Sequence, residues 1–220
     1  MILGTVNGAS IVALPSDTDP LCAAPSSIEW DPQEAVACTS NPFTGAEQLF
    51  DWGASWWQGQ LSFRSMTRYS ADVWQAFILE LRGGINVFSI GDPLRVAPKG
   101  VPLGAPLVSG AGQVGYSLVT RGWQPNSVGL LLPGDYFSVP IGPGPGTRLY
   151  RALEAVSSDA SGSATISFWP PLRDQPGDGV AIATSNCTGL FRLAANKGNK
   201  FSVNATTLDG FTGLAIREAI

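Results

Sequence analysis

The sequence predicts a mainly β protein with one helix, arranged as a β-barrel or β-sandwich. Its 26 glycines and 17 prolines make up nearly a fifth of the 220 residues, and they are spread so that turns are expected about every ten residues. Short runs that alternate between apolar and polar side chains lie between these turns. Only residues 70–82 have the periodicity of a helix. A chain of this length forms one large β domain or two small ones.

Residues 1–95 are predicted to hold a strand, the helix and a second strand. In the first strand, at 56–68, Leu61 and Phe63 share one face. Ser70 is the expected N-cap of the helix, and Gly83 and Gly84 end it. Asp72 would lie near the positive end of the helix dipole. The second strand is expected at 85–93, where Gly-Asp-Pro stops it.

The helix has a broad apolar stripe that we expect to cover the open side of a curved sheet. Its residues follow helical spacing: Val73, Trp74, Phe77, Ile78 and Leu81.

Residues 96–115 are rich in proline, glycine and alanine, and they are predicted to form a connector or an extended arm. In an assembly, such an arm lies on a neighbouring chain. Val101, Leu103 and Leu107 are its large apolar residues.

Residues 116–220 are predicted to be almost entirely β. The expected strands lie at 116–123, 129–139, 148–156, 162–170, 179–186, 189–195, 199–208 and 211–219. Residues 141–148, IGPGPGTR, form a hairpin tip. This part either completes the barrel of residues 1–95 or forms a second β domain.

Asp159 lies in SSDASG, which has the composition of a β-turn. Asp can accept hydrogen bonds from the backbone downstream of it, and Gly162 can take a positive φ. We therefore interpret Asp159 as a turn residue rather than a catalytic or calcium-binding carboxylate.

The usual catalytic groups are missing, and we expect no enzyme activity, cofactor or metal. The chain has no histidine, so a seryl or cysteinyl nucleophile would lack its usual base. The three cysteines have no CxxC spacing, which disfavours a disulfide framework. The spacing of the candidate carboxylates selects no catalytic pair among Asp135, Asp159, Asp174 and Asp178.

Charged residues make up only 14% of the chain, against about 25% in an average soluble domain. Either much of the surface is hidden against other chains, or neutral polar residues supply it. The net charge of −4 disfavours a nucleic-acid partner. No apolar run is long enough to insert in a membrane, and residues 1–17 do not resemble a secretory signal.

Trp52, Trp56 and Trp57 lie close together in the sequence, beside Gly53 and Gly59. Such a group could line a sugar site, or it could belong to the core or to a subunit interface.

Several motifs together resemble the distal tail protein family of long-tailed bacteriophages. In order, they are LSFRSMTR, ADVWQAFILELRGG and NVFSIGDP; SGAGQVGYSLVTRGW and LPGDYFSV; and LYRALEAVSSDASGSATISFWPPLR and GLFRLA. They cover residues 45–195 and describe strands and turns rather than a chemical site.

The resemblance implies a split-barrel-like hub domain with one helix, assembled into a hexameric ring at the tail tip in the virion. The implied partners are the tail tube protein, the tape measure protein, the baseplate hub and the tail fibre proteins. DNA would pass through the lumen without specific binding, and the chain would be made in the bacterial cytoplasm. Residues 52–57 and 96–115 are the expected ring interfaces.

Two other functions stay open at this stage. One is a β-sandwich module that binds host carbohydrate through exposed tryptophans. The other is an enzyme that cleaves cell-wall polysaccharide with two facing carboxylates.

Overall fold

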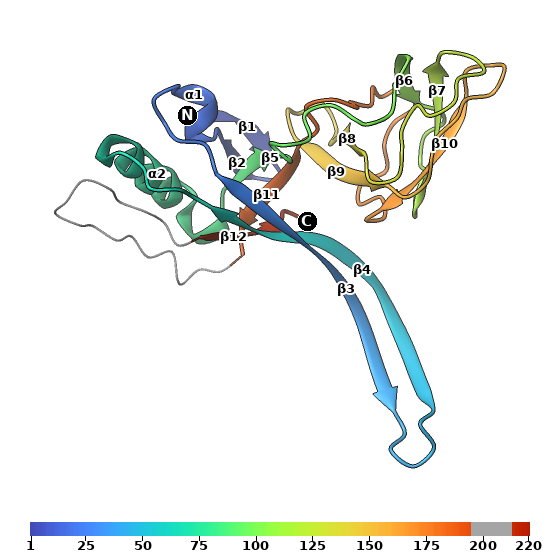
Figure 1. Ribbon diagram of the computed structural model, residues 1–220, viewed down its shortest axis with the longest axis horizontal. Helices are drawn as coiled ribbons and strands as arrows, with labels where there is room; N and C mark the ends of the chain where they lie inside the picture. Colours follow the sequence, from blue (N-terminus) through green and yellow to red (C-terminus); the bar gives the residue numbers. More distant parts are fainter. Residues whose placement is uncertain (195–212) are drawn as a thin grey trace.

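The computed structural model describes residues 1–194 and 213–220 and shows two sheets and one long helix (Figure 1). The larger sheet contains seven strands. In spatial order they are β1 (Ile2–Val6), β2 (Ala9–Val12), β5 (Val87–Ile90), β11 (Gly189–Leu193), β12 (Leu214–Glu218), β4 (Glu47–Ser62) and β3 (Ser27–Ser40). Adjacent strands in this sheet pair antiparallel, except β2 and β5, which are parallel.

The smaller sheet has five antiparallel strands and curls into a half barrel. In spatial order they are β6 (Gly104–Val108), β7 (Ser117–Trp123), β10 (Ala164–Trp169), β9 (Thr147–Ala152) and β8 (Tyr136–Pro140). The predicted fold class, mainly β with one helix, is confirmed.

The two sheets do not divide the chain at residues 96–115. All five strands of the smaller sheet lie between β5 and β11 in the sequence, and β11 and β12 then return to the larger sheet. Residues 96–115 contain β6, which pairs with β7, and the N–H of Val101 donates to the Gly129 carbonyl at 3.0 Å. The expected connector therefore contributes one edge strand, β6, to the smaller sheet.

Helix α2 (Arg68–Glu80) begins two residues earlier than predicted. Thr67 is the N-cap, because its hydroxyl accepts the N–H of Ser70 at 3.3 Å. Ser70 is buried inside the first turn, where its hydroxyl accepts the N–H of Ala23. Asp72 lies beyond the first turn, and it pairs with Arg68 instead of interacting with the positive end of the helix dipole.

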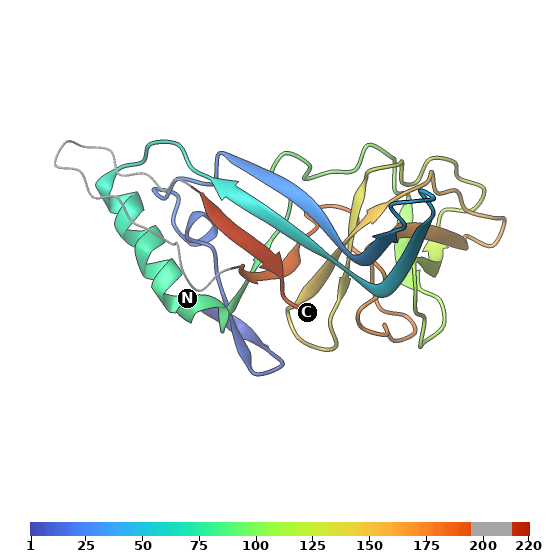
Figure 2. The ribbon, with the colours of Figure 1, turned by 90° about the horizontal axis from the view of Figure 1, so that it is seen from below.

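The apolar stripe of α2 covers the larger sheet, as predicted. Trp74, Phe77, Ile78 and Leu81 are buried in one cluster with residues of β4, β5, β11 and β12. The 3-10 turn η1 (Arg82–Gly84) follows, and the positive φ of Gly83 turns the chain toward β5. The helix α1 (Pro15–Thr18) is a single turn. Figure 2 shows α2 at one end of the molecule and the smaller sheet at the other.

Several predicted strands have different bounds in the structure. The strand expected at 56–68 ends at Ser62 and begins at Glu47. The runs at 129–139 and 179–186 contribute β8 and isolated bridges at Leu131, Ala181 and Ala183. The run at 199–208 lies outside the described residues.

The turn at Asp159 is built as its composition predicts. Its Oδ1 accepts the N–H groups of Ser161 and Ser163 at 2.8 and 2.9 Å, and the Ser161 hydroxyl at 2.7 Å. Gly162 has a φ of +75°, and a Cβ there would lie 2.4 Å from the Trp123 carbonyl oxygen. Glycine is needed at this position for both reasons.

Buried charges join the two sheets. Arg173 lies 3.6 Å from Glu218 of β12, and the N–H of Trp57 donates to the same carboxylate. Arg148 of β9 donates to the carbonyl of Ala219, which directly follows β12, and it also pairs with Asp174 at 2.8 Å. Burial raises the pKa of Glu218, against the lowering effect of Arg173. These contacts fix the joint between the sheets.

Candidate functional site

The most prominent feature outside the core is the far half of the β3–β4 hairpin, residues 36–52, which we call the arm (Figure 1). The strands pair from Ser27 and Ser62 out to Ser40 and Glu47. On its other side, β4 is covered by β12 only at residues 58–61. Residues 55–57 of β4 still pack on the body, and beyond Gly53 the hairpin is a two-stranded ribbon that leaves it (Figure 1).

The arm begins at an irregularity in the ladder. The register of β3 and β4 shifts between Glu34 and Val36, and Gly53 on the facing strand has a φ of +68°. Extra residues of this kind bend a strand and increase its twist. At the far end, the side chain of Asn41 accepts the N–H of Phe43, and Asn41 pairs with Ala46 to close the turn.

Both faces of the arm carry large apolar side chains that lack cover within the described chain. Ala37 is opposite Phe50 and Cys38 is opposite Leu49, so these two pairs point to opposite faces. On one face, Trp52 is 68% exposed and packs edge-on against Phe50 at 4.7 Å. On the other, Leu49 is 66% exposed. An isolated ribbon like this is marginally stable in water and requires packing from another layer.

The hairpin also carries the negative charge of the chain. Residues 27–62 contain five acidic residues and no lysine or arginine: Glu29, Asp31, Glu34, Glu47 and Asp51. The rest of the chain has 12 acidic and 13 basic residues, because the totals are 17 and 13. The hairpin therefore has a formal charge of −5, and the remainder has a charge of +1.

The three tryptophans of residues 52–57 do not form one cluster. Trp52 is on the arm, whereas Trp57 is 2% exposed and lies in the core. Trp56 is half-buried under Arg217, whose guanidinium carbon lies 4.5 Å from the ring centroid. Adjacent residues of a strand point to opposite faces, so proximity in the sequence did not place them together.

Among the apolar residues singled out at 96–115, Val101 and Leu103 are exposed and Leu107 is half-buried in β6. Leu107 lies in β6, and Val101 and Leu103 lie in the segment that leads into β6, away from the arm. Of the predicted interface residues, only Trp52 belongs to the arm. Phe43, Leu49 and Phe50 were not predicted as site residues, although Leu49 and Phe50 lie between the acidic residues Glu47 and Asp51 in the sequence.

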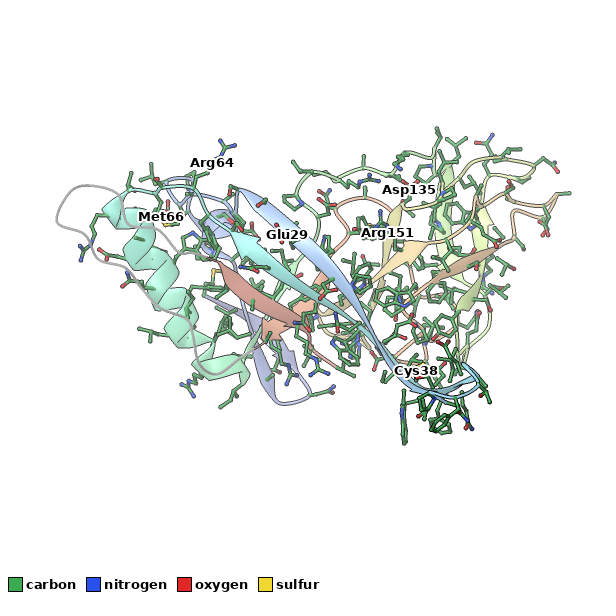
Figure 3. All side chains as sticks on the ribbon, turned by 60° about the horizontal axis from the view of Figure 1, so that its bottom comes forward. Glu29, Cys38, Arg64, Met66, Asp135 and Arg151 are labelled. Atoms are coloured by element: carbon green, nitrogen blue, oxygen red, sulfur yellow. The ribbon has the colours of Figure 1, made fainter. Side chains whose placement is uncertain are left out.

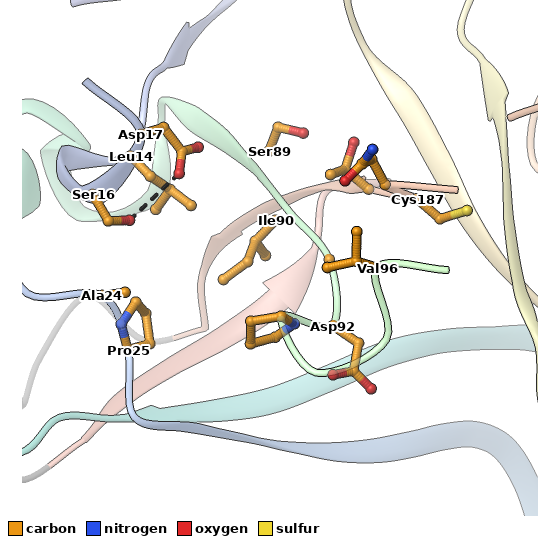
Figure 4. Close-up of a pocket in the computed structure, with 14 residues that line it drawn as sticks. Leu14, Ser16, Asp17, Ala24, Pro25, Ser89, Ile90, Asp92, Val96 and Cys187 are labelled. Carbon is orange, nitrogen blue, oxygen red and sulfur yellow. Dashed lines mark hydrogen bonds between the residues drawn. The ribbon is translucent and has the colours of Figure 1, made fainter. Parts of the chain in front are cut away.

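A pocket of about 340 Å³ lies where α1 faces the end of β5 (Figure 4). Its polar groups include Asp17 and Asp92, and the Ser16 hydroxyl donates to Asp17. The Cys187 thiol lines it too, but burial raises the pKa of that thiol to about 12. Cys187 is therefore protonated at neutral pH, and it donates to the carbonyls of Tyr136 and Ala183 rather than acting as a nucleophile.

A second cavity of about 390 Å³ lies at the root of the hairpin, between β3 and the strands β9 and β10. We call it the tryptophan groove. Its walls include Trp30, Trp57, Trp169, Glu34 and Arg151. Trp169 and Trp57 meet edge-to-face at 4.5 Å, and Trp30 and Trp57 at 5.5 Å. These tryptophans come from three strands, β3, β4 and β10, so their proximity could not be predicted from the sequence.

Within residues 1–194 and 213–220, no three metal-binding side chains gather as a possible metal site. The helices in these ranges are all too short or too polar to cross a membrane. Neither the scan against protein-family models nor the search of curated proteins found a match for the chain.

Proposed function

We propose that the chain is a structural subunit that assembles with copies of itself, and that the arm is one of its assembly surfaces. The arm is the observation that carries this proposal. A ribbon with exposed phenylalanine, leucine and tryptophan on both faces gains stability only when another chain covers it.

A closed ring fits this surface best. In a ring, each copy uses two different patches, one to reach its neighbour and one to receive the other neighbour. The arm projects from one side of the body, and in a ring each arm would contact a different patch on the next copy (Figure 1). The low content of charged residues is consistent with a surface that is largely covered in an assembly.

The resemblance of residues 45–195 to distal tail proteins suggests where such a ring would serve. On this proposal, the chain forms the hexameric ring of a phage tail tip, in the virion, between the tail tube protein and the baseplate hub and fibres. The slightly acidic chain, with a net charge of −4, would suit a lumen through which DNA passes without being bound.

The test compares the full chain with an armless variant. Because Glu34 pairs with Ser55, replacing residues 35–54 by Asn-Gly closes the hairpin with a two-residue turn and leaves its root intact. Light scattering and negative-stain imaging of the full chain should show rings of six copies with a central hole. The armless variant should be a monomer with the same circular dichroism spectrum.

The control replaces exposed apolar residues elsewhere, Leu94→Ser with Val128→Ser, and should still form rings. A full chain that stays monomeric at about 100 μM, or an armless variant that assembles equally well, would contradict the proposal.

A further inference from the structure

We infer that the tryptophan groove is a saccharide-binding site. This inference is independent of ring assembly, because the groove lies within a single chain at the root of the hairpin. Its volume, about 390 Å³, falls within the range of small-molecule sites and suits one or two pyranose rings.

The aromatic walls of the groove are held in fixed orientations. The indole N–H of Trp57 donates to the Leu149 carbonyl at 3.0 Å. The indole N–H of Trp169 donates to Glu34 at 2.8 Å. Trp30 lies over Gly59, where a Cβ would come within 3.4 Å of its ring and 2.5 Å of the Glu29 carbonyl oxygen. Pre-oriented rings lose little entropy when a flat apolar ligand binds to them.

The groove also has unused hydrogen-bonding capacity. Glu34 uses one carboxylate oxygen for Trp169, and its second oxygen has no hydrogen bond in the described structure. Arg151 uses Nε for the Gly134 carbonyl at 3.2 Å, which leaves its terminal nitrogens for a ligand. Glu34 and Arg151 line the same groove, and the described residues show no ion pair between them.

This combination of groups selects a hydroxylated, uncharged ligand. A hydroxyl group both donates and accepts, so it can satisfy a carboxylate and a guanidinium together. The C–H face of a sugar ring can pack against indole. A proline-rich peptide also packs against indole, but it has few N–H groups to offer Glu34. A phosphate ligand, or the acidic arm of another copy, would meet the negative charge of the hairpin.

The experiment follows intrinsic tryptophan fluorescence of the full chain during titration with cellobiose, maltose, lactose and diacetylchitobiose, and then uses a glycan array. We expect a saturable change with at least one sugar, with a Kd on the order of 1 mM or tighter. Trp169→Ala should weaken binding at least tenfold, and Glu34→Gln, which preserves an acceptor for Trp169, should weaken it several-fold.

Trp52→Ala is the matched control, because it removes an exposed tryptophan from the arm and should leave the affinity unchanged. Circular dichroism and thermal melting check that each variant is folded, and Glu34→Gln tests the site if Trp169→Ala does not fold. Three results would each overturn the inference. They are a response to none of the sugars on the array, an affinity in both the Glu34→Gln and Trp169→Ala variants equal to that of the parent, and saturable binding of a proline-rich decapeptide instead of a sugar.

Discussion

Asp159 shows how one side chain can specify a turn. Its pKa is lowered first by the Ser161 hydroxyl and then by the N–H groups of Ser163 and Ser161. A carboxylate with a folded pKa below the ordinary 3.8 stabilises the fold above that value, and this contribution is lost as the pH falls through the folded pKa.

We therefore expect the Asp159→Asn variant to be less stable than the parent at neutral pH, with a difference that shrinks below pH 3.8. The measurement is the melting temperature of both proteins between pH 2.5 and 7. Glu154→Gln, which changes an exposed acid outside the turn, is the control. A difference that stays constant over this pH range would show that the charge of Asp159 does not stabilise the turn.

Residues with local roles could be predicted from the sequence, and residues with long-range roles could not. Asp159 and Gly162 act within a few positions of each other, so composition was enough to identify their turn. The tryptophan groove brings Trp30 and Trp57 to Trp169, more than 100 positions away. Its assembly depends on how β3 packs against β10, which local pattern does not reveal.

At the scale of elements, the helix was predicted because it packs on one face and its apolar residues therefore follow a helical period. Its N-cap was predicted three residues too late, because the sequence offers two hydroxyl residues, Thr67 and Ser70, as caps. The cap must precede the helix with extended backbone, and Thr67 has a ψ of 156°.

The β3–β4 hairpin was only partly predicted, for the opposite reason. Alternation appears in a sequence when one face of a strand is buried and the other is in water. Along the arm both faces are exposed, so there is no alternation to find. Pro32 also argues against a central strand, but β3 lies at the edge of the sheet, where proline is tolerated.

Two tryptophans of the same strand are expected to have opposite effects on stability. Trp57→Ser removes a core ring and its hydrogen bond to Leu149, and it should lower the free energy of unfolding by about 3–5 kcal/mol. Trp52→Ser should change it by no more than about 0.5 kcal/mol in the monomer. Urea denaturation of dilute protein measures both values. A large loss for Trp52→Ser would mean that the arm packs on its own body.

At the scale of the whole molecule, charge is separated between the hairpin and the rest of the chain. Arg64 and Arg82 are exposed near the two ends of α2. Figure 3 shows Arg64 at the opposite end of the molecule from Cys38, which marks the arm. A ring needs its two patches in different places. We therefore expect the end of the molecule that holds α2, which we call the α2 end and which carries Arg64 and Arg82, to receive the acidic arm of a neighbour.

This arrangement predicts that charge reversal on either surface weakens assembly and that reversal on both restores it. Glu47→Lys with Asp51→Lys, or Arg64→Glu with Arg82→Glu, should each raise the dissociation constant of the ring about tenfold, or ~1.4 kcal/mol. Raising the salt concentration from 0.1 to 1 M should weaken the parent ring, because screening shortens the reach of charges from about 10 to 3 Å. Glu154→Lys is the control away from both surfaces, and light scattering at graded concentrations measures each protein. If the variant with all four substitutions assembles no better than the two double variants while all are folded, the α2 end does not receive the arm. The arm itself would still be needed for the ring.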